Sequence, residues 1–321
     1  MKNFRIVFMG TPDFAVATLG SLLMNGYNVV GVVTTPDKPA GRGRKINKSP
    51  VKEFAESSQL PTMQPENLKD PEFIDNLKNL NADVFVVVAF RMLPEVIWKI
   101  PSTGTFNLHA SLLPHYRGAA PINHAIINGE SVTGVTTFLI DDKIDTGNIL
   151  LREEVHIFPF ENAGDIHDRL MKQGARLVIK TLEGLASNMI KPQPQSLFIK
   201  PGETLKPAPK IFPKDCIIDW KKDPVAIHNL IRGLAPSPCA RSVLIKESSE
   251  LSFKIFESQP EAIKHNMNPG EIISDGIHFI KIACRDGFVS IGSLQLEGKK
   301  RMSTVEFLRG FKIRDYTIPV S

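Results

Sequence analysis

Two polar side chains able to act on a carbonyl group, Asn107 and His109, stand two residues apart in the apolar segment TFNLHA. A short apolar segment of this kind predicts a buried strand, and side chains on a strand alternate between its two faces. We therefore expect the amide and the imidazole on one face, as a pair of hydrogen-bond donors. The same pattern also fits a structural role, since buried Asn and His side chains are usually bonded within the chain.

A carboxylate, Asp145, follows about two dozen residues later in the segment GVTTFLIDDKIDTGNIL, just ahead of Gly147. Placed in the loop after the next predicted strand, it is expected to reach His109, fix its tautomer and favour the protonated ring. A plain Asx-turn role is the alternative, and Asp141 and Asp142 compete for the partner role. Between the strands, the SLLPHYRG segment predicts a turn whose Tyr116 and Arg117 anchor it or contact an acidic ligand.

The elements that must position these residues alternate between apolar strands and helical stretches over the first 160 residues or so. This alternation predicts an α/β domain with a doubly wound, mostly parallel, Rossmann-like sheet. The expected strands cover residues 5–10, 28–35, 82–90, 104–110, 134–140 and 148–157, with a minor strand near 62–64. The run 82–90 is continuously apolar and predicts a central strand, the run 148–157 predicts an edge strand, and an amphipathic helix is expected over 163–186.

A proline-rich stretch at 192–213 separates this region from the rest, and its six prolines predict an extended, stiff linker without a packed element. Beyond it we expect a helix at 224–234, five short strands and a last helix from about residue 303, which together favour a smaller β-barrel of the OB-like type. The predicted domains are therefore 1–189, a linker at 190–208, and 209–321.

Composition fits a two-domain globular protein, because 321 residues exceed the usual single core and 42% of them are hydrophobic. The net charge is +5, and residues 209–321 hold 17 Lys and Arg against 13 Asp and Glu, an excess that suits RNA or simply a solvated surface. We expect a cytoplasmic protein without a membrane segment. The three cysteines form no C-x-x-C pair, so neither disulfides nor structural zinc are expected.

Two glycine-containing loops differ from known nucleotide-binding motifs. The first, GTPDFA at 10–15, lacks the G-x-G-x-x-G fingerprint, so a dinucleotide is disfavoured, and its Asp13 caps a helix or its Phe14 lines a pocket. The second, at 36–52, is basic and is expected to be irregular and mobile. It suits either a solvated face or a phosphate backbone, and it is not a P-loop. His115, His124, His156 and His167 lack metal-ligand spacing, and no metal is expected.

Taken together, several segments resemble the folate-dependent formyltransferase family, and within it the enzymes that act on methionyl-tRNA. These segments are GTPDFA at 10–15, PAGRGRK at 39–45, FNLHASLLPHYRGAAPIN at 106–123, Asp145 with Gly147, and GKKRM at 298–302. The resemblance covers nearly the whole chain. It implies a formyl transfer from 10-formyltetrahydrofolate to the α-amino group of methionyl initiator tRNA, with Asn107, His109 and Asp145 as catalytic residues.

The resemblance also implies the residues that bind the two substrates. Folate is expected at the loop after the central strand, with Arg91, Met92, Leu93 and Pro94, and at Ser111, Leu112, Leu113, Pro114, Asp141 and Asp142. Phe14 borders the methionyl pocket. The tRNA is expected at Lys38, Arg42, Arg44 and Lys45, where Arg42 matches the loop arginine that senses the first base pair, and at Lys299, Lys300 and Arg301. The protein is expected to be a monomer.

Two positions depart from the family pattern. The loop after the central strand is FRMLP where the family often has YGxILP, and position 115 is His where Arg or Lys is common. Two further functions stay open. One is a sugar-nucleotide amine formyltransferase, which is expected to lack the PAGRGRK loop. The other is a non-catalytic RNA-binding protein on the same scaffold, which is expected to have lost a catalytic residue.

Overall fold

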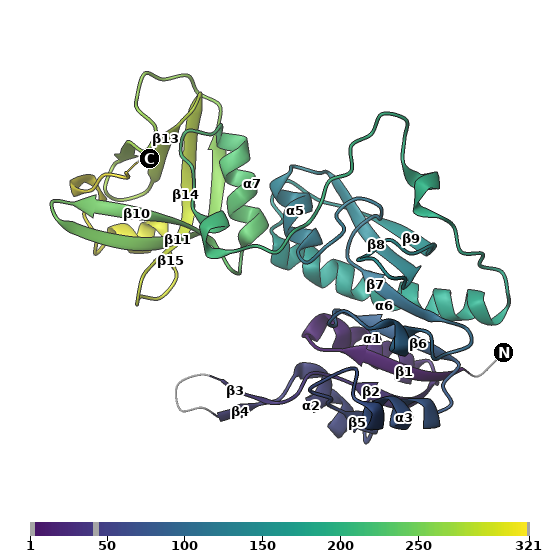
Figure 1. Cartoon of the computed structure of the whole chain (residues 1–321). Coiled ribbons are helices and arrows are strands. Elements are labelled where there is room, and N and C mark those ends of the chain that lie inside the picture. The colour runs from purple at the N-terminus through teal and green to yellow at the C-terminus, as the bar shows by residue number, and fades with distance from the viewer. Residues whose placement is uncertain (1–3, 41–44, 320–321) are drawn as a thin grey trace. The chain divides into compact units, whose positions relative to one another are not determined.

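The computed structural model describes residues 4–40 and 45–319, and it divides the chain into two compact units (Figure 1). The first unit contains Met1–Pro121, Val132–His156 and His167–Pro207. The second contains Ile122–Ser131, Ile157–Ile166 and Ala208–Ser321. Each unit is thus built from separate stretches of the chain, which periodicity along the sequence does not reveal.

The first unit is built on a sheet with the strand order β5-β2-β1-β6-β7-β8-β9. Neighbouring strands are parallel from β5 to β7. Strand β8 is antiparallel to β7, and β9 is antiparallel to β8. The mostly parallel, Rossmann-like sheet is therefore confirmed, and so is the edge position of β9. The strands are β1 (Arg5–Gly10), β2 (Asn28–Val33), β5 (Thr62–Met63), β6 (Val84–Val88), β7 (Thr105–His109), β8 (Val132–Leu139) and β9 (Ile149–His156).

Central strand β6, with the sequence VFVVV, is buried at every position. This burial explains its continuous apolar run, since helices cover both faces of a parallel sheet. The chain winds in opposite directions on the two sides of the β1/β6 pair, because β1 pairs with both β2 and β6. Ligands of such sheets bind beyond the carboxyl ends of the strands at this switch point. The loop that follows β6, residues 89–94, begins at that edge.

Two helices of this unit, α2 and α3, begin at side-chain caps. Helix α2 starts after Ser49, whose Oγ accepts the Lys52 N–H at 3.1 Å, and α3 starts after Asp70, which accepts the Glu72 N–H at 2.9 Å. Both have proline at the first helical position, where no N–H is needed. The helices are α1 (Asp13–Met24), α2 (Pro50–Ser57), α3 (Pro71–Asn79), α4 (Glu95–Trp98) and α6 (Ala163–Ala186).

Helix α6 packs against one face of β7 and β8. Its Gly174 leaves room for Leu108, since a Cβ at that position would lie 2.7 Å from a Leu108 methyl carbon. About two turns further on, the buried hydroxyls of Thr181 and Thr137 are 2.8 Å apart. Because neighbouring strand residues point to opposite faces, α6 occupies the face of Leu108 and leaves Asn107 and His109 on the other.

The second unit is an antiparallel sheet curled into a half-barrel, with the order β10-β11-β14-β13-β12 and with β15 paired to β14. Its strands are β10 (Ala240–Lys246), β11 (Ser249–Glu261), β12 (Ile272–Ser274), β13 (Ile280–Cys284), β14 (Gly287–Leu296) and β15 (Met302–Ser303). Its helices are α5 (Pro121–Ile127), α7 (Pro224–Leu234) and α8 (Thr304–Leu308).

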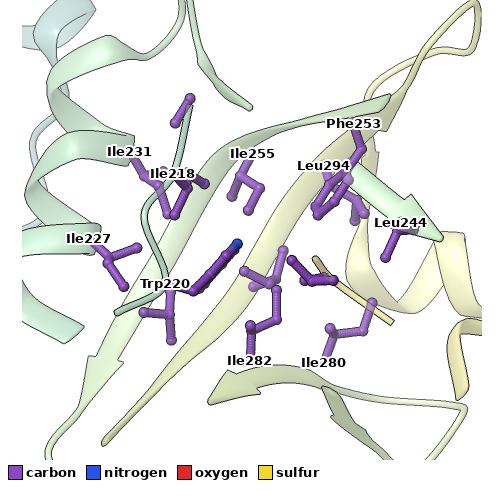
Figure 2. Packing of buried hydrophobic residues seen from close by; sticks show 14 of the residues in the cluster. Ile218, Trp220, Ile227, Ile231, Leu244, Phe253, Ile255, Ile280, Ile282 and Leu294 are labelled. Carbon is purple, nitrogen blue, oxygen red and sulfur yellow. The ribbon is translucent and has the colours of Figure 1, made fainter. Parts of the chain in front are cut away.

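The core of the half-barrel surrounds Trp220, which is 1% exposed (Figure 2). Ile227 and Ile231 of α7 point toward it from one side, and sheet residues such as Ile255 and Ile282 lie around it. The indole Nε1–H of Trp220 donates to the Ser242 hydroxyl at 3.0 Å, so its polar atom is also satisfied. A buried aromatic ring of this size stabilises the curled sheet by roughly 2–3 kcal/mol.

Two expectations about irregular segments were wrong. In the basic segment 36–52, short strands β3 (Lys38–Ala40) and β4 (Lys45–Asn47) pair antiparallel, so this segment is not wholly irregular. The proline-rich stretch is not a simple extended linker either. It contains the 3₁₀ turns η1 (Gln195–Phe198) and η2 (Pro213–Cys216), and Gln195 is only 4% exposed. Prolines at positions 192 and 194 leave the intervening backbone free to bond, and Gln193 pairs with Ile149 in both directions at 2.8 Å.

Candidate active site

Strand β7 carries Asn107 and His109 on the face that α6 leaves free. His109 is 6% exposed and Asn107 is half-buried. The partner strand supplies Phe138, which pairs with Asn107 in register and meets the His109 ring edge-on with the ring centroids 6.5 Å apart. The imidazole therefore lies in a partly apolar setting, where charge is less well solvated than in water.

The His109 ring lies between two oxygen atoms. Its Nε2 is 2.8 Å from the Tyr116 carbonyl oxygen, and because a carbonyl only accepts, Nε2 carries a proton and donates. Its Nδ1 is 3.8 Å from Oδ2 of Asp145, close enough for an ion pair when the ring is protonated but too far for a direct hydrogen bond. Nδ1 is thus the ring nitrogen that remains available to a reacting group.

The carboxylate of Asp145 reaches this position because its loop returns toward the sheet. Strand β8 runs antiparallel to β7 and ends at Leu139, opposite Phe106. The loop then turns back, with Asp145 in the left-handed region at φ +55° and with its Oδ2 accepting the Gly118 N–H at 2.9 Å. Gly147 is buried against the Leu139 carbonyl, where a Cβ atom would overlap the oxygen. Glycine is therefore required for this return.

The competing aspartates do not reach the imidazole. Asp141 accepts the Lys143 N–H at 3.1 Å and the Thr146 hydroxyl at 2.7 Å, so it stabilises the turn of its own loop. Asp142 is exposed. Among the three carboxylates that the sequence offered here, Asp145 is the one placed beside His109.

The amide of Asn107 differs from these groups, because within the described part of the chain its side chain makes no hydrogen bond. A half-buried amide without a partner is uncommon in a finished fold, where such groups are usually satisfied. Its two N–H donors face the same side as the His109 ring. The Asn107 amide therefore offers an incoming oxygen atom two N–H donors that the described part of the fold does not use.

The turn at 111–118 is held by its own polar groups. The Ser111 hydroxyl donates to the His115 carbonyl at 2.8 Å, and the Ser111 carbonyl accepts the Thr136 hydroxyl at 2.6 Å. Ser111 and Leu113 are completely buried, Pro114 is buried and Leu112 is half-buried. The Ser111 and Leu113 side chains thus face the interior of the chain, and folate contact at this turn stays a prediction.

The loop after β6 is anchored by Arg91, which sequence reasoning assigned to folate. Its guanidinium donates to the carbonyls of Glu66, at 2.9 Å, and Pro65, and partial burial lowers the pKa of the guanidinium. Leu93 is buried, whereas Met92 is 74% exposed. A cavity of about 1010 Å³ opens at this loop, lined by Arg91, Met92, Pro94 and residues of the segments 66–69 and 95–100. The departure FRMLP thus gives this loop an arginine anchor of its own.

Sequence reasoning missed Gln195, the buried residue of the proline-rich stretch. Its Nε2 donates to the carbonyls of Asp145 and Gly147, both at 2.9 Å. Its Oε1 accepts from Nε and Nη2 of Arg117 at 3.1 and 2.6 Å. The second departure, His115, has a partner in the same stretch, with its Nε2 3.0 Å from Oε1 of Glu203. The only sequence signal for these contacts was a polar side chain among prolines.

Phe14, expected at the methionyl pocket, is 6% exposed in the first turn of α1. Its ring meets that of His167 edge-on, with the centroids 5.3 Å apart. The neighbouring Asp13 is the first helical residue rather than the cap, where its charge complements the positive end of the helix.

The basic residues expected to meet RNA fall into three groups. Lys38 is exposed at the start of β3, whereas Arg42, Arg44 and the side chain of Lys45 lie outside the described part of the structure. Lys299 and Lys300 are exposed in the turn between β14 and β15. Arg301 is tied within the chain, since its Nε donates to the Ser293 hydroxyl at 2.7 Å, its Nη2 pairs with Glu257, and it lies 4.6 Å from the Phe256 ring centroid.

Within the described residues, no helix is long and apolar enough to cross a membrane, and no group of three or more His, Cys, Asp or Glu side chains is arranged to hold a metal ion. The cysteines Cys216, Cys239 and Cys284 are free and buried, and burial raises the pKa of the Cys284 thiol to about 11.

Both parts of the chain match known protein families. A family profile described as "Formyl transferase" matches residues 4–182, and one described as "Formyl transferase, C-terminal domain" matches residues 210–312. A methionyl-tRNA formyltransferase of Bacteroides fragilis is 52% identical over 315 residues, which cover 98% of this chain and 97% of that protein. One of Flavobacterium johnsoniae is also 52% identical, covering 98% of both chains.

Solved structures with the same fold are more distant. The N-formyltransferase of Helicobacter canadensis, in complex with folinic acid and dTDP-3-aminofucose, matches with a TM-score of 0.65 at 22% identity, over 93% of this chain and all of that one. HypX of Aquifex aeolicus in complex with tetrahydrofolic acid matches with a TM-score of 0.62 at 18% identity, over 98% of this chain and 51% of that one. At these identities the likeness concerns the fold alone.

Proposed function

The chain belongs to the formyl transferase family, and from this premise we propose that it formylates the α-amino group of methionyl initiator tRNA with 10-formyltetrahydrofolate as donor. The acceptor follows from relatives that are 52% identical over nearly the full chain and are named methionyl-tRNA formyltransferases. The basic turn with Lys299 and Lys300 and the basic segment around Arg42 support an RNA acceptor over a small sugar nucleotide.

The reaction requires the neutral amine of the methionyl group to attack the formyl carbon. A new C–N bond forms, and the formyl oxygen becomes an oxyanion in the tetrahedral intermediate. The bond from that carbon to N10 of the folate then breaks, N10 takes up a proton, and the amine nitrogen loses one. Donors that meet the oxyanion lower the barrier most, since they act on charge that is absent from the ground state.

The observation that carries the proposal is the pair of donors on β7. Asn107 has N–H groups that the described part of the fold does not use, and His109 stands beside it with Nδ1 available. We assign both to the oxyanion. Asp145, at 3.8 Å from Nδ1, is assigned to orient the ring and to receive the amine proton through a water.

Folate binding is proposed at the loop of Arg91, Met92 and Leu93, where β6 ends at the switch point of the sheet. The exposed side chain of Met92 supports this placement. The described residues that line the cavity of about 1010 Å³ include none of Asn107, His109 and Asp145, so this cavity is not assigned to the folate. Contacts with Ser111 to Pro114, with Asp141 and with Asp142 remain part of the proposal, as do the contact of Phe14 with the methionyl group and a monomeric state.

Acceptor class is the point to test. The purified chain is incubated with 10-formyltetrahydrofolate, methionyl initiator tRNA and an amino-sugar nucleotide in one reaction, and the products are identified by mass spectrometry. We expect a formyl group on methionine and none on the sugar. The same tRNA carrying N-acetylmethionine is the control, because its blocked amine cannot react. Formylation of the sugar alone would assign the chain to the other branch, and formylation of neither would reject the proposal.

A further inference from the structure

Gln195 connects the two loops that surround His109, and we propose that it is a positioning residue for the formyl transfer site. The inference rests on the proposed function and adds a residue from outside the family's catalytic motif. Gln195 lies in η1, about 50 residues beyond Asp145, and is 4% exposed. A buried polar side chain far from its partners in sequence is kept only where its hydrogen bonds are satisfied.

Every polar group of this side chain has a matching partner. The amide nitrogen has two N–H donors, and the carbonyls of Asp145 and Gly147 accept them at 2.9 Å each. The amide oxygen accepts from Nε and Nη2 of Arg117 at 3.1 and 2.6 Å. Only a carboxamide offers both two donors and an acceptor in this arrangement, since a carboxylate has no donor and a hydrocarbon has neither.

The two loops that Gln195 joins contain both hydrogen-bond or ion-pair partners of the His109 imidazole. His109 Nε2 donates to the carbonyl of Tyr116, the residue before Arg117, and Nδ1 faces Asp145. The same loops are bonded a second time, since Asp145 Oδ2 accepts the Gly118 N–H at 2.9 Å. Gln195 therefore fixes the distance between the loop that orients the ring and the loop that supplies its carboxylate.

Backbone strain shows why an external clamp is needed. Asp145 is at φ +55° and Tyr116 at φ +60°, in the left-handed region that non-glycine residues adopt only when the surroundings impose it. Two of the bonds from Gln195 end in the Asp145 loop and two end at Arg117, directly beside Tyr116. Without them, fewer hydrogen bonds hold the two residues in these conformations.

Gln195 is itself held from outside the site. On one side Gln193 pairs with Ile149 of β9, and on the other Phe198 packs against Leu113, Phe138 and Ile149. The Arg152 guanidinium lies 4.6 Å from the centroid of the Phe198 ring. The residues on both sides of Gln195 are therefore tied to the sheet, and the clamp is part of the scaffold.

The test compares Gln195→Leu and Gln195→Glu with wild type in single-turnover formyl transfer. The leucine variant removes all four bonds, and the glutamate variant keeps the acceptor for Arg117 but removes both donors. We expect the single-turnover rate constant to fall by about tenfold to a hundredfold in both, as for other displacements of about 1 Å at a reacting centre. Michaelis constants for folate and tRNA should stay near those of wild type, because no substrate contact is lost.

A matched control separates positioning from general destabilisation. Thr181→Val removes the buried hydroxyl pair with Thr137 on the opposite face of the sheet. This variant should lower the melting temperature while keeping the wild-type rate constant. If Gln195→Leu fails to fold, Gln195→Glu decides. The inference is overturned if both Gln195 variants keep the wild-type rate constant, or if the Thr181 variant loses as much. Absence of formyl transfer by wild type would instead reject the proposed function.

Discussion

The loops around His109 and the turn that carries Lys299 and Lys300 differ in whether their polar side chains have partners within the chain. Around His109, the ring, Asp145 and Gln195 all find partners within the chain. At the turn, Lys299 and Lys300 are exposed, and within the described residues their ammonium groups have no ion-pair partner. These polar groups of the first region are thus satisfied within the chain, whereas the second region exposes charge that an external anion can neutralise.

Arg301, which follows Lys299 and Lys300 directly, differs from them in having partners within the chain. Its guanidinium is paired with Glu257 and bonded to Ser293, so only the two lysines before it offer unpaired charge. Rigid donors favour a transition state, and exposed cations favour binding to phosphates. Substitutions in the first region should therefore lower kcat, and substitutions in the second should raise KM for tRNA.

The largest effect is expected from Asn107→Ala. This change removes the oxyanion donor that the fold leaves unused, and loss of one such donor typically lowers kcat by about 10²–10³. Binding of tRNA should not change, because the amide is assigned to the oxyanion and not to the RNA. Steady-state formylation together with filter binding measures both quantities. A variant that turns over at the wild-type rate would remove Asn107 from the mechanism.

The next effect is expected from Asp145→Asn. The amide oxygen can still accept the Gly118 N–H, and asparagine tolerates the left-handed backbone, so the loop should stay in place. The charge facing Nδ1 of His109 is lost, and we expect kcat to fall by roughly 10², the lower end of acid–base contributions. The pH dependence of kcat, measured beside wild type, shows whether charge or geometry matters. Equal activity at all pH values would contradict the pairing.

A smaller effect that depends on salt is expected from replacing both Lys299 and Lys300 with alanine. Each lysine that contacts a phosphate adds about one to the slope of log affinity against log salt, so the double variant should lose about two. Its KM for tRNA should rise while kcat stays the same. The matched control replaces both lysines with arginine, which keeps the charge. An unchanged slope in the alanine variant would exclude this turn from the RNA interface.

The smallest effect concerns stability of the second unit. Burial holds the pKa of His228 below its ordinary 6.5, and the nearby Arg232 charge acts in the same direction. The unfolded chain therefore binds the proton first as pH falls, so stability is complete above the ordinary pKa and decreases below it. Urea unfolding at about pH 7.5 and about pH 5.5, followed by Trp fluorescence, should show this loss, and His228→Gln should reduce it. A larger loss in the variant would contradict the assignment.

Periodicity along the chain predicted the framework of the site well. The alternation in TFNLHA was enough to place Asn107 and His109 on one face, since β7 covers 105–109 and α6 packs on the face of Leu108. In the second unit, helix α7 begins and ends where the sequence predicted it, at 224 and 234. Local pattern sufficed in these cases because each element buries one face determined by its own residues.

Contacts between distant segments were not accessible in the same way. Proline density at 192–213 predicted an extended linker, yet Gln195 is buried against residues 48, 50 and 78 positions away. The sequence favoured Asp145 but left Asp141 and Asp142 as competitors, and the return of the loop is what brings Asp145 alone of the three to His109. The burial of Gln195 and the placement of Asp145 depend on which distant segments meet in space, and local propensity does not determine those contacts.

The central claim is most directly tested by one measurement, the rate of formyl transfer from 10-formyltetrahydrofolate to methionyl initiator tRNA compared with methionyl elongator tRNA. Both carry the same amine, so the reaction at Asn107 and His109 is held constant and only the RNA differs. We predict formylation of the initiator and little or none of the elongator. Absence of transfer to the initiator would contradict the assignment of the reaction, and equal rates on both would contradict selection through the RNA.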